Sequence, residues 1–385
     1  MKKYTVNTDC LNFPLDRPCS YQKNNRILCE KCDCYRKISK SQEQKRILII
    51  KLGAMGDVLR TTFLLWGLKE LYPKSIISWI VDNNNADVLK HNTLIDNIIT
   101  NDENISKFLI NNFFDMVISL DLAFESLFLA KLSNKSEVIG FTLDDNRNII
   151  ASNQFAQQWL KMSAYDDLKK NNLYTYQHWM AQIVSLPKDN YEIIVPLQKE
   201  AQEKALNFLR DNNTSQNQKI LGINPGAGKR WNLKKWTIEG FIETAKHFSK
   251  KGYTVLLLGG KQDEKEIDVI LKEKIPNALS TGTDNTIADF FAKINLCDVV
   301  LCGDTMALHA AVGLKKNVVA LFGPTSINEI EIYCRGTKIQ GKKNCVTCYK
   351  QECHLENNCM QTITPKEVID TIEKYMGVSK NPDVS

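Results

Sequence analysis

The residues best suited to chemistry begin at a glycine turn near one end of the chain. The stretch Lys51-Leu-Gly-Ala-Met-Gly-Asp57 follows the apolar run 47–50 and precedes an apolar-periodic segment. This order predicts a strand, a turn and a helix, the opening βα unit of a doubly wound domain. Gly53 and Gly56 permit a tight turn and a close approach of the backbone to a ligand. Asp57 falls in the first helical turn, at the sheet edge where open α/β sheets bind ligands, so it either caps the helix or acts as a general base.

A second glycine loop, Asn224-Pro-Gly-Ala-Gly-Lys-Arg-Trp231, follows another predicted strand. Its candidate ligand-binding residues are Gly226, Ala227, Gly228, Lys229 and Arg230. The two glycines free backbone N–H groups to approach a phosphate, and the two cations add positive charge. The loop therefore suits an anionic ligand, although a glycine turn alone is weak evidence.

Two further loops also follow predicted strands. Their candidate substrate-binding residues are Asp263 and Glu264 in 259–264, and Asp304, Thr305, Met306 and His309 in 303–309. The acids of the first loop can lie near a ribose or a base. In the second, a helix N-terminus points at the ligand and His309 lies one turn beyond Thr305 on the same face. Alone, these features are a surface acid, an N-cap and a core histidine, but three loops at one sheet edge form an anion site.

Twelve cysteines are many for a protein without disulfides, and nine of them cluster. The C-terminal cluster is Cys345, Cys348, Cys353 and Cys359; the N-terminal cluster is Cys10, Cys19, Cys29 and Cys32, with Cys34 as a spare. Four thiolates at the C-terminal spacing suit tetrahedral zinc or iron, against the alternative of reduced loop cysteines without metal. The N-terminal set is more loosely spaced and could form a second site, or the two clusters could share one. Any such metal would be structural.

Alternating strands and helices must position these loops. The predicted strands are 47–51, 76–81, 115–120, 137–140, 219–223, 254–258, 298–302 and 318–322, and the principal predicted helices are 57–71, 199–209, 238–251, 263–273, 287–294 and 306–312. This pattern predicts an α/β fold of two Rossmann-like doubly wound domains with an interdomain cleft. The predicted boundaries are a Cys-rich extension at 1–45, a first domain at 46–190, a linker and helix at 191–217, a second domain at 218–362 and a helix and tail at 363–385.

Composition limits the class of protein. Of 385 residues, 43% are hydrophobic and 24% charged, as in soluble globular proteins. No apolar run is long enough to span a bilayer and the first residues lack the apolar core of a secretion signal, so we expect a cytoplasmic protein. The net charge of +6 is concentrated in residues 1–51, which hold twelve Lys and Arg against five Asp and Glu. This excess could face anionic lipid at the inner face of the membrane or a phosphorylated acceptor, or be a solvated surface.

As a set, the motifs resemble those of the ADP-heptose:lipopolysaccharide heptosyltransferases, glycosyltransferase family nine. The matching segments, in the family's order, are 51–59, 224–231, 257–260, 303–305 with 309–311, and 321–325, so the resemblance covers roughly residues 46–375. The resemblance implies a GT-B fold and a metal-independent, inverting transfer of heptose from an ADP-sugar to a lipopolysaccharide core or related cell-envelope glycan. No Asp-x-Asp occurs, which fits a transferase without a catalytic metal.

The resemblance also assigns roles. Asp57 would take the proton of the acceptor hydroxyl, and Lys229 with the helix after Thr305 would stabilise the departing diphosphate. Asp263 or Glu264 would contact the nucleoside. Asp304 would order its loop and cap the helix, and His309 would either contact phosphate or support the helix.

Two departures from the family pattern leave the sugar open. Met306 stands where the family usually has glycine, and Gly53-Ala54 stands where members often carry small hydroxyl residues. The alternatives are a protein acceptor or another nucleotide sugar, since some protein-glycosylating members resemble this chain in having cysteine-bound iron in a C-terminal loop. A non-catalytic metal- or redox-responsive module on a GT-B scaffold is a third, against which Asp57 and Lys229 both argue. We expect no nucleic-acid partner, and a nicotinamide enzyme is excluded because neither domain opens with Gly-x-Gly-x-x-Gly and a suitably placed acid.

Overall fold

The computed structural model describes residues 4–8, 10, 12–14, 16–35, 44–215, 218–228 and 232–377. Contacts divide the chain into two compact units. Unit 1 comprises Met1–Leu52, Tyr72–Asn83 and Ile95–Asn153; unit 2 comprises Gly53–Leu71, Asn84–Leu94 and Gln154–Ser385. The turn and helix that carry Asp57 therefore belong with the C-terminal part of the chain, and the domain boundaries given above stay a prediction.

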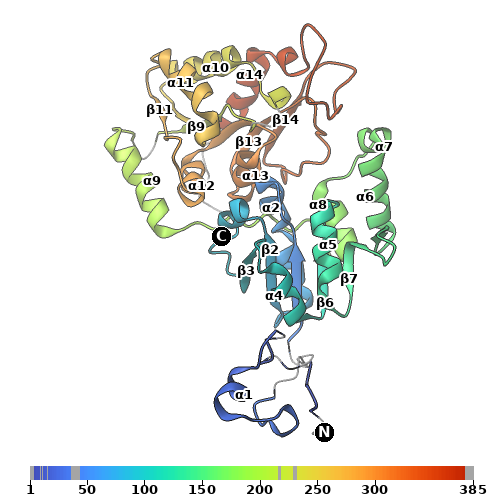
Figure 1. Ribbon diagram of the computed structural model, residues 1–385. Coiled ribbons are helices and arrows are strands. Elements are labelled where there is room, and N and C mark those ends of the chain that lie inside the picture. Colours follow the sequence, from blue (N-terminus) through green and yellow to red (C-terminus); the bar gives the residue numbers. More distant parts are fainter. Residues whose placement is uncertain are drawn as a thin grey trace. The chain divides into compact units, whose positions relative to one another are not determined.

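Unit 1 contains a six-stranded sheet in the order β3-β2-β1-β5-β7-β8 (Figure 1). All neighbours are parallel except β7 and β8, which pair antiparallel. The elements of this unit are α1 (Ser20–Asn25), η1 (Cys29–Lys31), β1 (Arg46–Ile50), β2 (Ile76–Val81), β3 (Asn97–Thr100), α4 (Ile105–Asn111), β4 (Phe113–Phe114), β5 (Met116–Ser119), α5 (Phe124–Leu132), β6 (Asn134–Lys135), β7 (Val138–Leu143) and β8 (Ile149–Ala151). The short 3₁₀ helix η2 (Asn83–Val88) crosses the boundary between the units.

The core of unit 1 joins the sheet to α4 and α5. Its buried side chains are Leu48, Ile50, Leu52, Ile80, Ile105, Leu109, Phe114, Val117, Leu129 and Ala130. Strand β1 is apolar at four successive positions, as expected for a central parallel strand that is covered on both faces. Just after it, Lys51 is only 5% exposed and is paired with Asp121, whose other oxygen accepts from the Leu52 N–H at 3.1 Å.

Unit 2 contains a second six-stranded sheet, all parallel, in the order β11-β10-β9-β12-β13-β14. Its elements are α2 (Met55–Thr61), α3 (Leu64–Leu71), α6 (Gln154–Ala164), α7 (Asp166–Lys170), α8 (Tyr176–Val184), α9 (Lys199–Asp211), β9 (Ile220–Asn224), η3 (Asn232–Lys234), α10 (Ile238–Lys250), β10 (Thr254–Leu257), η4 (Lys261–Asp263), α11 (Glu264–Lys272), β11 (Ala278–Ser280), α12 (Ile287–Leu296), β12 (Val299–Gly303), α13 (Met306–Gly313), β13 (Asn317–Phe322), β14 (Gly336–Gln340), η5 (Met360–Thr362) and α14 (Pro365–Met376).

Helices cover both faces of this sheet. Helices α10, α11 and α14 share one buried core with alternate strand residues such as Leu221, Leu257 and Leu301. Helix α13 packs on β12 and β13 and also contacts α12 and α2, and α9 packs on α12. The order of strands reverses between β9 and β12, and the crevice at such a reversal is where doubly wound sheets bind ligands.

Two of the differences between the structure and the predicted elements concern the helix that carries Asp57 and the edges of the sheets. The single helix predicted over 57–71 is two helices, α2 and α3, separated at Thr62 and Phe63. The hydroxyls of Thr61 and Thr62 donate to the carbonyls of Asp57 at 2.6 Å and Leu59 at 2.7 Å, so side chains engage the backbone where the helix breaks. Edge strands β3, β8, β11 and β14 were not predicted, because each contains at most one buried residue and shows no long apolar run.

Candidate active site

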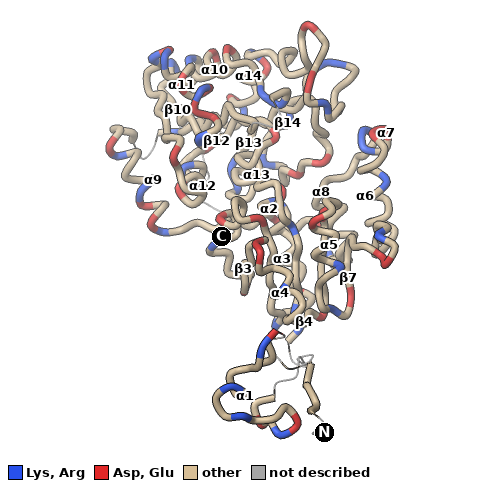
Figure 2. Tube along the Cα trace, in the orientation of Figure 1, with Lys and Arg blue, Asp and Glu red and all other residues tan. Residues whose placement is uncertain are grey.

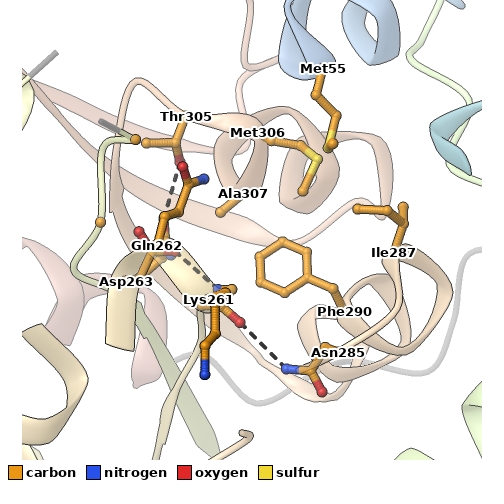
Figure 3. Close-up of a pocket in the computed structure, with 15 residues that line it drawn as sticks. Met55, Lys261, Gln262, Asp263, Asn285, Ile287, Phe290, Thr305, Met306 and Ala307 are labelled. Atoms are coloured by element: carbon orange, nitrogen blue, oxygen red, sulfur yellow. Dashed lines mark hydrogen bonds between the residues drawn. The ribbon is translucent and has the colours of Figure 1, made fainter. Parts of the chain in front are cut away.

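A pocket of about 550 Å³ opens at the carboxyl edge of the unit 2 sheet (Figure 3). The loops after β9, β10, β11 and β12 all contribute to it, together with the start of α2. Its lining residues are Met55, Asn224, Gly226, Gly228, Gly259, Gly260, Lys261, Gln262, Asp263, Asn285, Ile287, Phe290, Thr305, Met306 and Ala307. The pocket therefore lies at the reversal of strand order, where the glycine motifs were expected to meet.

The loop after β9 leaves its backbone open to the pocket. A Cβ atom at Gly226 would lie 1.8 Å from Oδ1 of Asp263, so only glycine fits there. Gly228 has φ +69°, a conformation that side chains rarely adopt. Both glycines are thus required by the geometry of the loop. Lys229 and Arg230, the predicted cations of this loop, lie outside the described residues.

The two acids of the loop after β10 have different surroundings. Asp263 is 7% exposed, and its Oδ2 accepts from the Gly260 N–H at 3.0 Å. Burial raises the pKa of the Asp263 carboxyl above its ordinary value. Glu264 does not line the pocket; its Oε1 accepts from Nζ of Lys261 at 3.1 Å. Of the two candidates for nucleoside contact, only Asp263 reaches the pocket wall.

Helix α13 begins at the pocket. Its N-cap is Thr305, whose side chain makes no capping bond and instead donates to Oδ1 of Asn224 at 3.1 Å. The predicted cap, Asp304, was wrong: its Oδ2 accepts from Nζ of Lys234 at 2.7 Å, and both side chains are 14% exposed. Burial opposes ionisation of Asp304, but Lys234 outweighs it and keeps the carboxyl's pKa below its ordinary value. Among the described residues, no side chain is therefore seen to cap the N–H groups of the first turn of α13.

Apolar side chains form the opposite wall. Figure 3 shows Phe290 and Ile287 from α12 turned into the same space as Met306 and Met55. Met306 takes the place where glycine was expected, so this chain presents a thioether beside the start of α13. A flat aromatic ligand can lie against such a wall while its anionic part faces the glycine loops.

Asp57 lies in α2 and is held by Arg60, three residues further along the helix. A terminal nitrogen of Arg60 is 2.8 Å from Oδ1 of Asp57, and the guanidinium stacks 3.9 Å from the ring centroid of Tyr176. The Arg60 side chain is 12% exposed and that of Asp57 38%. Burial would lower the pKa of Arg60, but the charges of Asp57 and its neighbours raise it. Asp57 is thus an accessible carboxylate fixed by a buried cation.

His309 on α13 lies against the turn that carries Gly56. A Cβ at Gly56 would be 3.2 Å from Cδ2 of His309 and 3.5 Å from Cα of Met306, so glycine allows α2 and α13 to approach closely. His309 is 5% exposed, and burial together with the charge of Arg60 lowers its pKa to about 4. It is therefore neutral at pH 7 and cannot offer a positive charge to a phosphate.

Comparison with known proteins decides the family. The model of glycosyltransferase family 9 (heptosyltransferase) matches residues 104–359, about two thirds of the chain. The chain belongs to this family. Lipooligosaccharide heptosyltransferase 2 of Campylobacter jejuni serotype O:6 is 29% identical over 162 residues, which are 40% of this chain and 51% of that protein. The chain thus spans about half the length of the Campylobacter relatives it matches.

Solved structures show the same fold. The family 9 glycosyltransferase of Veillonella parvula has a TM-score of 0.75 and 17% identity, covering 88% of this chain and 99% of that one. The E. coli ADP-heptose lps heptosyltransferase II has a TM-score of 0.62 and 16% identity, covering 86% and 98%. The GT-B class of α/β fold predicted from the motifs is confirmed.

In this family 9 chain the candidate residues fall into distinct places. Those that line the pocket are Gly226, Gly228, Asp263, Thr305 and Met306; those outside its lining are Gly53, Gly56, Asp57, Ala227, Glu264, Asp304 and His309. Asp57, Asp304 and His309 nevertheless share one electrostatic cluster with Arg60 and Lys234 around α2 and α13. The structure therefore separates a ligand pocket from a charged cluster beside it.

Several residues of the candidate site in this family 9 chain were not predicted. Arg60 follows Asp57 by three positions, a helical spacing that could have revealed the pair. Asn285 and Phe290 follow β11, a strand of three residues that the pattern did not indicate, so their loop could not be placed at the sheet edge. The ion pair between Lys234 and Asp304 could not be predicted, because no sequence motif links these two positions.

The C-terminal cysteines of this family 9 chain gather around a second, smaller cavity. It measures about 230 Å³, and its lining includes Cys345, Cys348, Cys353, His354 and Cys359. Burial raises the pKa of the Cys359 thiol, and the neighbouring thiols of Cys348 and Cys345 raise it further. Among the residues that the structure describes, no three His, Cys, Asp or Glu side chains are already close enough to hold a metal ion. The cavity thus brings the predicted ligands together without fixing a coordination geometry.

Proposed function

We propose that this protein transfers heptose from ADP-heptose to a hydroxyl of a lipopolysaccharide core or a related cell-envelope glycan. One observation carries this proposal: the pocket at the strand reversal joins two glycine loops and a helix N-terminus to an apolar wall, and α2, with Asp57, packs against that same helix. A nucleoside diphosphate matches both halves of the pocket. Membership of family 9 and the heptosyltransferase activity of its relatives support heptose as the sugar.

The donor would lie with its base on the Phe290 wall and its diphosphate at the glycine loops. Backbone N–H groups of the loop after β9 and of the first turn of α13 would donate to phosphate oxygens. Lys229 would add the cation that stabilises the departing ADP. Asp263, which lines the pocket, would contact a ribose hydroxyl.

The proposed reaction needs one proton transfer. The acceptor hydroxyl attacks the anomeric carbon while the Asp57 carboxylate takes its proton, and the bond from that carbon to the phosphate oxygen breaks as ADP leaves. Attack on the face opposite the leaving group inverts the anomeric configuration. The step uses no metal, because α13, Lys229 and the glycine loops supply the electrostatic stabilisation that a divalent ion would give.

Calorimetric titration with ADP, UDP and GDP tests the donor site. We expect selective binding of ADP, weakened at least tenfold by Lys229→Ala. Preference for UDP or GDP would retain the fold and the mechanism but contradict heptose as the sugar. Absence of binding to all three nucleotides would contradict the transferase itself.

Asp57→Asn tests the base. Transfer to a heptose-free lipopolysaccharide core should fall by two to four orders of magnitude, a typical loss for a general base, while ADP binding stays unchanged. Transfer that survives this substitution would contradict the assignment of Asp57. The non-catalytic module would be favoured if wild-type protein bound ADP but transferred no sugar to either a glycan or a protein acceptor.

The cysteine-lined cavity is proposed to hold a structural zinc or iron ion. Cys345, Cys348, Cys353 and Cys359 supply four thiolates, the ligand set that both metals accept. Metal analysis of protein carrying Cys348→Ser should show loss of one metal equivalent, with ADP binding retained. An unchanged metal content would contradict this site.

The acceptor is proposed to be lipid-linked, with the basic N-terminal segment facing anionic lipid on the cytoplasmic side of the membrane. Figure 2 shows Lys and Arg distributed along that segment, and none of the described helices is long and apolar enough to cross a bilayer. We expect co-sedimentation with anionic vesicles at low salt that is lost at raised salt. Absence of binding at low salt would contradict membrane contact and favour a soluble acceptor.

A further inference from the structure

Among its described residues, 4–8, 10, 12–14 and 16–35, the N-terminal segment has no buried side chain. The helices in these residues are the six-residue α1 and the short η1. The first of the described residues to be buried is Ile47. Segments of fewer than about 40 residues rarely fold without a disulfide or a metal.

Four cysteines of this segment nevertheless surround one cavity. The cavity measures about 300 Å³, and Cys10, Cys19, Cys29 and Cys32 all line it. Apolar side chains, including Val6, Phe13, Ile27 and Leu28, complete the wall. Cys34, only two residues from Cys32, does not line the cavity, so the structure separates four cysteines from the fifth.

Hydrogen bonds hold the cysteine-bearing turns in place. The side chain of Asn7 donates to the Cys29 carbonyl at 3.1 Å, and the Cys10 N–H donates to the Asn7 carbonyl at 3.1 Å. The Cys32 N–H donates to the Cys29 carbonyl at 3.4 Å, which closes the turn between these two cysteines. Cys10 is thereby tied to the Cys29–Cys32 turn across some twenty residues of sequence.

None of the four cavity cysteines is in a disulfide, and each is half-buried. Their thiols are therefore available to a ligand in the cavity.

From this cavity, and from the lack of buried side chains among the described residues of the segment, we infer that Cys10, Cys19, Cys29 and Cys32 form a four-thiolate metal centre, which holds the N-terminal segment folded. Each thiol gives its proton to solvent as its sulfur binds the metal. A zinc ion and an iron–sulfur cluster both use four such ligands. The four cysteines line a cavity, but their sulfurs are not already close enough together to hold one ion. Binding of a single zinc ion would require the cysteine side chains to move towards the centre of the cavity. An iron–sulfur cluster is larger and would fill part of the cavity itself.

Metal analysis of full-length protein purified without oxygen tests the site. To remove the other cysteine set, the background carries Cys345→Ser, Cys348→Ser and Cys353→Ser, which leaves the buried Cys359 in place. In this background we expect one centre per chain, either one zinc or iron with acid-labile sulfide and absorbance near 400 nm. Adding Cys29→Ser should remove it, whereas the matched control Cys34→Ser should not.

A second readout reports folding of the segment. Tryptic cleavage at Arg17, Lys23, Arg26 or Lys31 should become at least tenfold faster with Cys29→Ser and stay unchanged with Cys34→Ser. ADP binding should be the same in both variants, which shows that the rest of the chain is folded. The inference is overturned if the background holds no metal, if Cys29→Ser leaves the metal in place, or if thiols alkylated at lysis show the four cysteines joined in disulfides.

Discussion

At the scale of single residues, Arg60 is the most informative group that the motifs did not indicate. Its ion pair with Asp57 fixes a half-exposed carboxylate, and its stacking on Tyr176 fixes the guanidinium in turn. A planar guanidinium can stack on an aromatic ring while it donates hydrogen bonds in its plane, which the ammonium of lysine cannot do. Arg60 is therefore a positioning residue for the proposed base.

Replacing Arg60 by Met should lower kcat by roughly ten- to a hundredfold, because a mobile carboxylate accepts the acceptor's proton less often. The acidic limb of the kcat/KM profile should move to higher pH, since a carboxylate without its cation takes up a proton more readily. Arg60→Lys should recover only part of the loss. The matched control is Lys90→Met, which breaks an exposed pair of the same helical spacing, 2.6 Å from Asp87. Equal effects at both positions would contradict the positioning role.

The low pKa of His309 makes stability depend on pH. In the folded chain the pKa is about 4, whereas an unfolded histidine has its ordinary value of 6.5. Between these two pH values the unfolded state binds a proton that the folded state does not. The contribution of His309 to the free energy of unfolding is therefore fully present above pH 6.5 and is lost as the pH drops towards 4. The loss between pH 7 and pH 5 should be about 2 kcal/mol, from about 1.4 kcal/mol per pH unit.

Urea unfolding at pH 7 and pH 5 measures this loss, with His309→Gln as the comparison. Gln stays neutral throughout, so the variant should lose about 2 kcal/mol less than wild type over this range. The charged groups around His309 are Arg60, Asp57, Asp304 and Lys234, all of which remain in the variant. Identical losses in both proteins would show that His309 does not carry the effect.

At the scale of elements, the pocket depends on two loops that fit each other. The carboxylate of Asp263 occupies the space where a side chain at position 226 would lie. A methyl group added at Gly226 would therefore displace the loop after β10. Gly226→Ala should weaken ADP binding at least tenfold in calorimetry. In an Asp263→Ala background the same change should cost less than twofold, because the clash is gone. Additive losses would mean that Gly226 acts through its backbone alone.

Sequence patterns predicted the central strands and the glycine loops but not the edges of the sheets. The buried run before Lys51 and the run 299–302 are apolar throughout, so a strand is the simplest interpretation. Strand β14 contains Lys338 and only one buried residue, and β11 has none, so neither shows a strand pattern. Because β11 was not predicted, Asn285 and Phe290, which follow it, were not predicted to line the pocket. Contacts such as Lys234 with Asp304 span 70 residues and arise only from the fold.

At the scale of the whole molecule, ADP should act on unit 2. Binding to the folded state at a hundred times Kd adds about 2.7 kcal/mol to stability. Hydrogen exchange should slow in the loops 225–228 and 259–263 and in the first turns of α13. Amides of β1, β2 and β5 in unit 1 serve as the internal control and should exchange as before. Protection confined to unit 1 would contradict the proposed donor site.

The grouping of residues 53–71 with the C-terminal part also bears on how this protein could be re-engineered. A chimera that takes only the segment after the linker from a relative would pair a foreign α13 with the resident α2. The residues of the two helices would then not be matched, and the close contact of Gly56 with His309 and Met306 could be lost. Exchanging unit 2 intact between relatives therefore requires transplanting three stretches of sequence, Gly53–Leu71, Asn84–Leu94 and Gln154–Ser385.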